Sequence, residues 1–237
     1  MHCAVNYLLC RIEHNIQNGN RPKTPNADFK INSLIVMLKN VKSILLLVES
    51  DNIGGAFSLL RSLIESMFVY LAIYDDEGVA EEYYKFMNYR IKYESTGQYP
   101  EEFSELLSQK VLPYNYLNYG WIDSIQKKKH KYTLREVIDC SKKTDKRYND
   151  YFLAAYKYCC KFSHGNFINQ IINIDSFVWI LERAGGILVN LLRQFAYVFQ
   201  DTIVYNGINL EEYLVANVKQ ATLIFQKLTQ KSNNDER

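Results

Sequence analysis

The chain has 237 residues, of which 48% are hydrophobic and 23% are charged, as in an ordinary soluble globular protein with a sizeable core. Its 28 basic and 26 acidic side chains leave a formal net charge of +2. This balance excludes a strong overall field that would recruit nucleic acid or anionic lipid, although it leaves room for a local basic patch. The 4 prolines and 10 glycines argue against long linkers and against a turn-rich all-β fold.

The cysteines and the N-terminus predict a cytoplasmic protein. The number of cysteines is odd, and none forms a Cys-x-x-Cys pair: Cys3, Cys10, Cys140, Cys159 and Cys160. This pattern favours a reducing compartment over a disulfide framework. The first residues, MHCAVNYLLCRIEHN, lack the basic start and long apolar run of a signal peptide. Charges interrupt the most apolar segments, so no membrane span is expected.

The first part of the chain shows three helical stretches. Apolar residues recur at helical spacing over residues 4–17 and, after a loop with two prolines, over residues 28–49. Ser50-Asp51-Asn52 then offers a break and an N-cap. Residues 53–74 are apolar nearly all round, which favours a helix in the middle of a bundle.

Further helices are expected along the rest of the chain. A polar helix is predicted over residues 78–95, another begins at Pro100, and residues 112–132 read as loop and short helix. Thr133 and Glu136 have the spacing of a capping box for a helix over residues 134–141. The last helices are predicted over residues 147–164, with Gly165-Asn166 as the stop, 176–203 and 209–229.

These segments predict the fold class. No credible strand alternation and no internal repeat is found, so we expect an all-α, single-domain bundle of about eight to ten helices. The domain is expected to cover residues 1–230, and residues 231–237 are expected to form a disordered tail.

Two charges stand in the most apolar helix. Arg61 and Glu65 are four residues apart and therefore share a helix face, on which Arg61 falls beside Phe57, Ile64 and Phe68. Burying such charges costs several kcal/mol each unless they are paired and hydrogen-bonded. The pair therefore predicts either an internal salt bridge that holds the bundle or a site that binds an anion or orients a histidine.

The stretch YKYCCKFSHGN, residues 156–166, holds a second group of candidates. His164 has the side chain whose ordinary pKa suits acid–base work near neutrality. Neighbours on a helix point about 100° apart, so the adjacent Ser163 is interpreted as a cap or supporting hydroxyl rather than a nucleophile. Tyr156, Ser163, Asn166 and, from the middle of the chain, Trp121 are expected to line the same site.

Metal and cofactor sites are not expected. The chain has no phosphate-binding Gly-rich loop, no His-Glu-x-x-His and no paired acidic motif with metal-ligand spacing. One weaker possibility is a Cys₂His₂ zinc site, because Cys10 and His14 repeat the four-residue spacing of Cys160 and His164. The run QKKKHKY, residues 126–132, is interpreted as a solvated loop or as a phosphate contact.

Three runs resemble a bacterial family of helical proteins of unknown function. They are AFSLLRSLIESMFVYLAIYDD (56–76), YGWIDSIQ (119–126) and RYNDYFLAAYKYCCKFSHGN (147–166). They present an Arg-x-x-x-Glu helix, a central Trp, and a Tyr-rich helix that ends in Ser-His. The resemblance covers roughly residues 30–200 and implies no particular activity.

The chain is more loosely similar to HEPN domains. These are helical bundles, commonly dimeric, and many are endoribonucleases of toxins or antiphage systems. Their signature is an Arg followed four to six residues later by a His. His164 matches the histidine, but no Arg precedes it at that spacing, and Lys157 stands before it with six residues between. Arg61 would have to substitute from another helix, and the resemblance implies a homodimer.

Two functions are therefore expected as alternatives. In the first, the protein is a metal-independent endoribonuclease of the toxin or antiphage type, with RNA as its partner. His164 is then the general base or acid, Arg61 stabilises the developing charge, and Glu65 holds Arg61. In the second, the protein is a non-enzymatic binding module for a partner protein or small effector, in which Arg61, Glu65 and His164 form a buried polar network.

Overall fold

The structure is a computed structural model that covers most of the chain. It describes residues 1–20, 22, 26–74, 76–99, 101, 113–125, 131–140, 146–163, 174–200, 204–205, 208–216, 218–220 and 223. These residues pack as two compact units. Unit 1 comprises Met1–Met67 and Tyr151–Arg237, and unit 2 comprises Phe68–Asp150.

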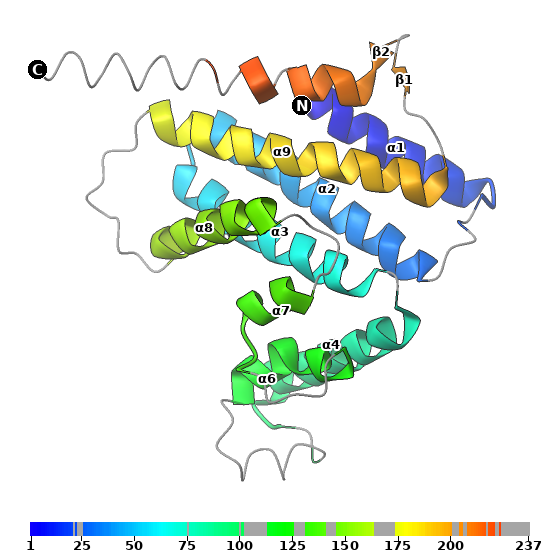
Figure 1. Cartoon of the computed structure of the whole chain (residues 1–237), viewed down its shortest axis with the longest axis vertical. Coiled ribbons are helices and arrows are strands. Elements are labelled where there is room, and N and C mark those ends of the chain that lie inside the picture. Colours follow the sequence, from blue (N-terminus) through cyan, green and yellow to red (C-terminus); the bar gives the residue numbers. More distant parts are fainter. Residues whose placement is uncertain are drawn as a thin grey trace, which may run out of the picture. The chain divides into compact units, whose positions relative to one another are not determined.

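Unit 1 is built mainly from long helices (Figure 1). They are α1 (His2–Gln17), α2 (Ala27–Glu49), most of α3 (Ile53–Ile73), most of α8 (Lys146–Ser163) and α9 (Ile174–Phe199). Helix α9 packs along α2, and α1 packs against α2. Gly185 permits a further close contact on α9, because a Cβ there would lie 2.7 Å from Cγ2 of Val218. The helical residues after the strands therefore pack on α9 as well.

The core of unit 1 follows from the apolar stripes of these helices. Leu8, Leu34, Phe57 and Phe195 are fully buried, one from each of α1, α2, α3 and α9. At about 25 cal/mol per Å² of apolar surface, burying each such side chain stabilises the fold by about 2 kcal/mol. Asn52 caps α3, because its side-chain Oδ1 accepts a hydrogen bond from the Gly55 amide at 3.0 Å.

Unit 2 is a smaller group of helices. Helix α4 (Glu77–Thr96) packs against α6 (Pro113–Tyr119) and the 3₁₀-helix η2 (Gly120–Ser124), and η2 contacts α7 (Leu134–Cys140). One half of the capping box predicted for α7 is formed, since the Thr133 amide donates to Oε2 of Glu136 at 3.1 Å. Asp76 caps α4 in a similar way by accepting from the Val79 amide at 3.2 Å.

The all-α fold class is confirmed, and the number of helices falls within the predicted eight to ten for the described residues. The predicted helix over residues 134–141 corresponds to α7, and the one over residues 147–164 to α8. The expectation of a single domain over residues 1–230 stays a prediction. The tail 231–237 and residues 102–112, which follow Pro100, lie outside the described part of the chain.

The end of α9 differs from the prediction. The helix expected over residues 176–203 ends at Phe199, and Gln200 has a positive φ of 51°. Two short antiparallel strands follow, β1 (Val204–Tyr205) and β2 (Ile208–Asn209), with Val204 opposite Asn209. The sequence between them is Asn-Gly, the strongest short-range signal for a two-residue hairpin, and the helical prediction overlooked it.

Two described helices, α2 and α3, are long and apolar enough to cross a membrane by length and composition. About half of each apolar stretch is buried inside the protein, as in the core helices of soluble proteins. The absence of a membrane partner and the cytoplasmic location therefore stay predictions.

Candidate functional site

Arg61 lies on α3 and reaches across to α8. Its Nη2 donates a hydrogen bond to the hydroxyl of Tyr156 at 3.3 Å. Its guanidinium carbon also lies 5.4 Å from the centre of the Tyr156 ring, within range of a cation–π contact. Phe57, Leu60 and Ile64 of the same helix are fully buried, and this packing fixes the side of α3 from which Arg61 extends.

The charge of Arg61 is retained in this half-buried position. Burial lowers the pKa of the guanidinium, but the hydrogen bond to Tyr156 and the electrostatic interactions with Tyr156 and Cys160 outweigh burial, so the pKa lies above its ordinary value. The Nε atom of Arg61 is buried and has no hydrogen-bond partner among the described residues. Arg61 thus keeps its full charge and an unused N–H donor.

Glu65 is linked to Arg61 through Tyr156. Burial raises the pKa of Tyr156, the nearby charge of Glu65 raises it further, and Arg61 acts in the opposite direction. Tyr156 is therefore a neutral hydroxyl at physiological pH. Within the described part of the chain, the hydrogen bond of Arg61 goes to this hydroxyl, and the predicted support of Arg61 by Glu65 stays a prediction.

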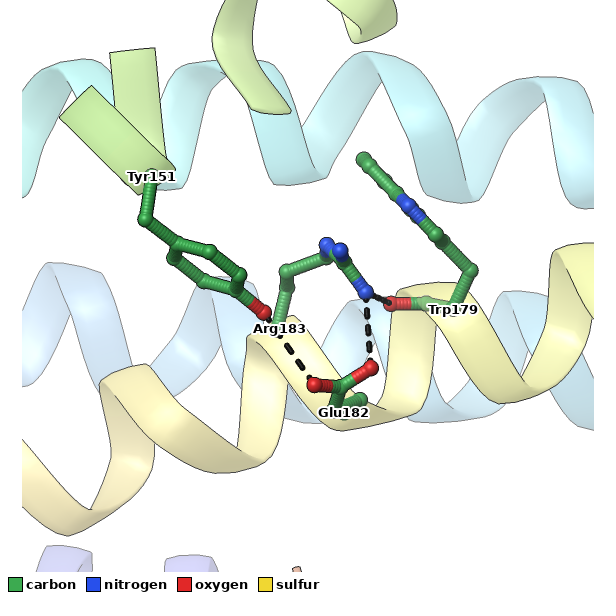
Figure 2. A network of polar contacts seen from close by, with 4 residues as sticks. All are labelled: Tyr151, Trp179, Glu182 and Arg183. Atoms are coloured by element: carbon green, nitrogen blue, oxygen red, sulfur yellow. Dashed lines mark hydrogen bonds and ion pairs between the residues drawn. The ribbon is translucent and has the colours of Figure 1, made fainter. Parts of the chain in front are cut away.

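A second half-buried arginine lies on α9. Figure 2 shows Arg183 between the rings of Tyr151 and Trp179, with guanidinium-to-centroid distances of 5.0 Å and 4.0 Å. Its Nη1 donates to Oε2 of Glu182 at 2.8 Å and to the carbonyl oxygen of Trp179 at 3.3 Å. The hydroxyl of Tyr151 donates to the other carboxylate oxygen of Glu182 at 3.2 Å.

The Arg183 network was missed by the sequence analysis. The side chains of Arg183 and Glu182 are only 14% and 17% exposed, and the Nε of Arg183 is buried without a hydrogen-bond partner in the described region. One signal was available, because Trp179 and Arg183 are four residues apart and therefore adjacent on a helix face. That spacing favours the observed stacking of guanidinium on indole.

Arg61 and Arg183 both affect the pKa of Cys159 on α8. Burial, followed by the charge of Cys160, raises the pKa of the Cys159 thiol to about 12, while Arg183 and Arg61 both act to lower it. Cys159 is fully buried and stays protonated near neutral pH. It is therefore a packing residue rather than a nucleophile.

An aromatic cluster joins α3, α8 and α9 beside the two arginines. Phe57 stacks on Phe162 with ring centroids 3.8 Å apart. Tyr158 lies 5.8 Å from Phe57 and 5.0 Å from Trp179, measured between centroids. These contacts fix the rotation of α8 about its own axis. Tyr156 and Cys160 therefore face Arg61, while Tyr158 projects from the opposite side of the helix.

The remaining predicted site residues are not all brought together. His164 and Asn166 lie outside the described residues, and only the backbone of Ser163, at the end of α8, is described. Trp121 is 1% exposed in unit 2, where its Nε1 donates to the carbonyl oxygen of Asn118 at 3.0 Å. Trp121 packs in the core of that unit, and its role in binding stays a prediction.

The described residues offer no metal site. Among them, no group of three His, Cys, Asp or Glu side chains could hold an ion. His14 contacts Asn18, with 2.9 Å between its Nε2 and Nδ2 of the amide, and the zinc site that would join it to His164 stays a prediction. The lysine cluster at residues 127–129 and His130 lie outside the described part of the chain.

This arrangement has a clear chemical capacity. A guanidinium carries five N–H donors in a planar fork that matches phosphate and carboxylate groups. Tyr156 uses one donor of Arg61 and holds the fork in place, while the charge is not neutralised through that bond. The Arg61 site is therefore suited to binding an anion.

Comparisons with known proteins place the chain among uncharacterised helical proteins. The model of a family of unknown function, DUF5677, matches residues 31–176, which is more than half of the chain. No curated protein and no solved structure matched. The match confirms the expected helical family of unknown function and begins close to the predicted residue 30, although it ends well before residue 200. The similarity to HEPN domains stays a prediction.

Proposed function

The chain belongs to the family of unknown function DUF5677, and we propose that it is a metal-independent endoribonuclease that holds a phosphate of RNA at Arg61. The observation that supports this proposal is the state of Arg61, whose hydrogen bond in the described structure goes to a neutral hydroxyl and whose Nε is buried there without a hydrogen-bond partner. A fixed guanidinium can hold a phosphate through charge-assisted, bidentate hydrogen bonds.

Spacing in the sequence is the reason for pairing Arg61 with His164 in this proposal. Arg61 interacts electrostatically with Tyr156 and Cys160, which are four residues apart and share a face of α8. In the sequence, position 164 is the next member of this four-residue series. On this spacing in the sequence we propose that His164 acts together with Arg61, with Ser163 and Asn166 as further candidates for the same site.

The proposed reaction is an internal transfer of the phosphodiester. His164 takes the proton of the ribose 2′-hydroxyl, and the 2′-oxygen forms a bond to phosphorus. The bond from phosphorus to the 5′-oxygen breaks, and this oxygen takes a proton from water. Arg61 stabilises the added negative charge on the non-bridging oxygens. Tyr156 and Glu65 hold the guanidinium, and the products are a 2′,3′-cyclic phosphate and a 5′-hydroxyl.

The test uses the purified full chain with a fluorescently labelled RNA in the presence of EDTA. We expect cleavage with the two product ends named above, read by denaturing gel and mass spectrometry. His164→Ala should slow cleavage by at least about 10²-fold, the usual contribution of a general base, with unchanged circular dichroism. His14→Ala, an exposed histidine paired with Asn18, is the matched control and should cleave normally.

Two results would reject the ribonuclease. One is cleavage at the same rate in His164→Ala as in the parent, which would point to a contaminant. The other is cleavage that requires added metal. We further propose that the active form is a cytoplasmic homodimer, as the resemblance implies, and sedimentation of the purified protein tests this assembly.

A second candidate is a non-enzymatic binding module for a partner protein or small effector. It is favoured by the number of half-buried polar contacts, since Arg61–Tyr156 and Arg183–Glu182 both lie between packed helices. Such networks rigidify a core without any chemistry. Overexpression separates the two candidates, because a ribonuclease should be toxic and relieved by His164→Ala, whereas a binding module should be harmless.

A further inference from the structure

One face of α8 combines exposed tyrosines with exposed lysines. Tyr151 and Tyr158 are 40% and 36% exposed, although both rings also pack against the protein. Lys157 and Lys161 on the same helix are exposed. The charged side chains within residues 151–163 are all basic, while the exposed Asp150 directly precedes them on α8 and the Glu182 carboxylate beside Tyr151 is paired with Arg183.

The two kinds of residue occupy different edges of the face. At about 100° per residue, Tyr151 and Tyr158 project within about 20° of each other, whereas Lys157 and Lys161 project about 80–120° away from Tyr151. Tyr156 and Cys160 interact with Arg61 and form a third edge of α8. The lysine edge lies between this third edge and the edge that carries Tyr151 and Tyr158. Passing around α8, one therefore meets the Arg61 contacts, then the lysines, then the tyrosines.

The tyrosine rings are held in place before any ligand binds. Tyr151 donates to Glu182 at 3.2 Å and lies over Arg183 (Figure 2). Tyr158 contacts the rings of Phe162 and Trp179 at centroid distances of 5.3 Å and 5.0 Å. A ring that is already fixed loses little conformational entropy when a ligand stacks on its exposed side.

We propose that this face of α8 binds single-stranded RNA, with phosphates along Lys157 and Lys161 and bases stacked on Tyr158 and Tyr151. A positively charged track beside aromatic rings is the arrangement by which proteins bind single strands without sequence preference. The inference rests on the proposed ribonuclease function, because this face of α8 would hold the RNA substrate next to Arg61.

The spacing of the rings decides between single and double strands. Seven residues of helix separate Tyr151 from Tyr158 by about 10 Å along the axis. Stacked bases within one strand of a duplex are about 3.4 Å apart. The two rings therefore suit bases that are splayed out of a stack, which only a single strand provides at low cost.

Binding is measured apart from cleavage, by fluorescence anisotropy with a short 2′-O-methyl oligocytidylate in EDTA. This probe lacks the 2′-hydroxyl that the proposed reaction needs. Tyr158→Leu keeps apolar bulk but removes the ring, and it should weaken binding about tenfold. Tyr158→Phe keeps the ring and should bind like the parent. Tyr213→Leu, a 49% exposed tyrosine on a different helical segment, is the matched control.

The lysines are tested by salt dependence. Replacing Lys157 and Lys161 together by Gln should flatten the slope of log affinity against log salt by about 1.4, since each phosphate contact on a single strand contributes about 0.7. Lys39→Gln, an exposed lysine of α2, should leave the slope unchanged. A duplex of the same length should bind more weakly than the single strand.

The outcomes separate this inference from the proposed function. Failure of the parent to bind the probe, or equal binding by Tyr158→Leu and the parent, overturns the inference even if ordinary RNA is cleaved. Binding that depends on the tyrosines and lysines supports it even if His164→Ala leaves cleavage unchanged, in which case only the ribonuclease is rejected.

Discussion

Arg61 and Arg183 are two half-buried guanidinium groups in similar surroundings with different partners. Each comes from a helix that flanks α8, each lies over a tyrosine ring of α8, and each has a buried Nε without a hydrogen-bond partner in the described structure. Arg183 donates to the carboxylate of Glu182 at 2.8 Å, whereas Arg61 donates to the hydroxyl of Tyr156 at 3.3 Å.

The difference teaches which arginine is a candidate for binding. A carboxylate next to a guanidinium neutralises most of its field, so Arg183 belongs to a closed structural network. A neutral hydroxyl positions the guanidinium without cancelling its charge. Arg61 is therefore the one of the two that we propose as an anion-binding residue, and substitutions of the two arginines should affect different properties of the protein.

The largest expected effect is on catalysis at Arg61. Arg61→Lys keeps the charge but loses the planar fork, and it should lower the rate of RNA cleavage by about 10²-fold because the transition-state charge is no longer clamped. The midpoint of urea unfolding should change little. Arg193→Lys, an exposed arginine paired with Glu211, is the control and should cleave normally. Equal rates in Arg61→Lys and the parent would remove Arg61 from the site.

The next effect is on stability at Arg183. Arg183→Ala leaves the Glu182 carboxylate without its cation in a position where that side chain is 17% exposed, and it should destabilise the fold by about 2 kcal/mol. Urea unfolding followed by circular dichroism measures this loss. Glu182→Gln in the same chain should recover part of it. A loss below about 0.5 kcal/mol, typical of an exposed pair, would show that the network is not structural.

The sequence predicted the helices better than it predicted these two sites. Apolar spacing located α1, α2 and α3 to within two residues, because helices that pack on a core need a regular stripe. The end of α9 was misplaced since helical periodicity was followed past Phe199 into a segment with a hairpin signal.

Contacts between distant residues were beyond prediction. The bond from Arg61 to Tyr156 spans 95 positions, and nothing in a single sequence states that these two helix faces meet. Arg61 was singled out because a charge in an apolar helix is costly. Arg183 was overlooked because a single sequence does not show that tertiary packing leaves this side chain only 14% exposed.

A smaller effect is expected at Tyr156. Tyr156→Phe removes the acceptor for Nη2 of Arg61 and should cost about 1 kcal/mol of stability. The rate of RNA cleavage should fall less than in Arg61→Lys, since the guanidinium remains but is less well positioned. The decisive measurement is the cleavage rate of the double variant that carries both Arg61→Lys and Tyr156→Phe. If the two losses in rate add fully, Tyr156 does not act through Arg61.

The smallest expected effect is a pH dependence in the Arg183 network. Burial, together with the charge of Glu182, raises the pKa of Tyr151 to about 12, while Arg183 acts to lower it. Because the folded pKa exceeds the unfolded value of about 10, the protonated hydroxyl favours the folded state. Its contribution is fully present below about pH 10 and is lost as the pH rises towards 12.

Tyr151→Phe has no proton to lose at this position. Its unfolding midpoint in urea, followed from pH 9 to pH 11, should therefore decline less than that of the parent, although other tyrosines still titrate. Burial also raises the pKa of Tyr156, so Tyr156→Phe should change the pH profile in the same direction. Parallel profiles for the parent and Tyr151→Phe would mean that Tyr151 is solvated like a free phenol, and the network around Arg183 would then be open rather than closed.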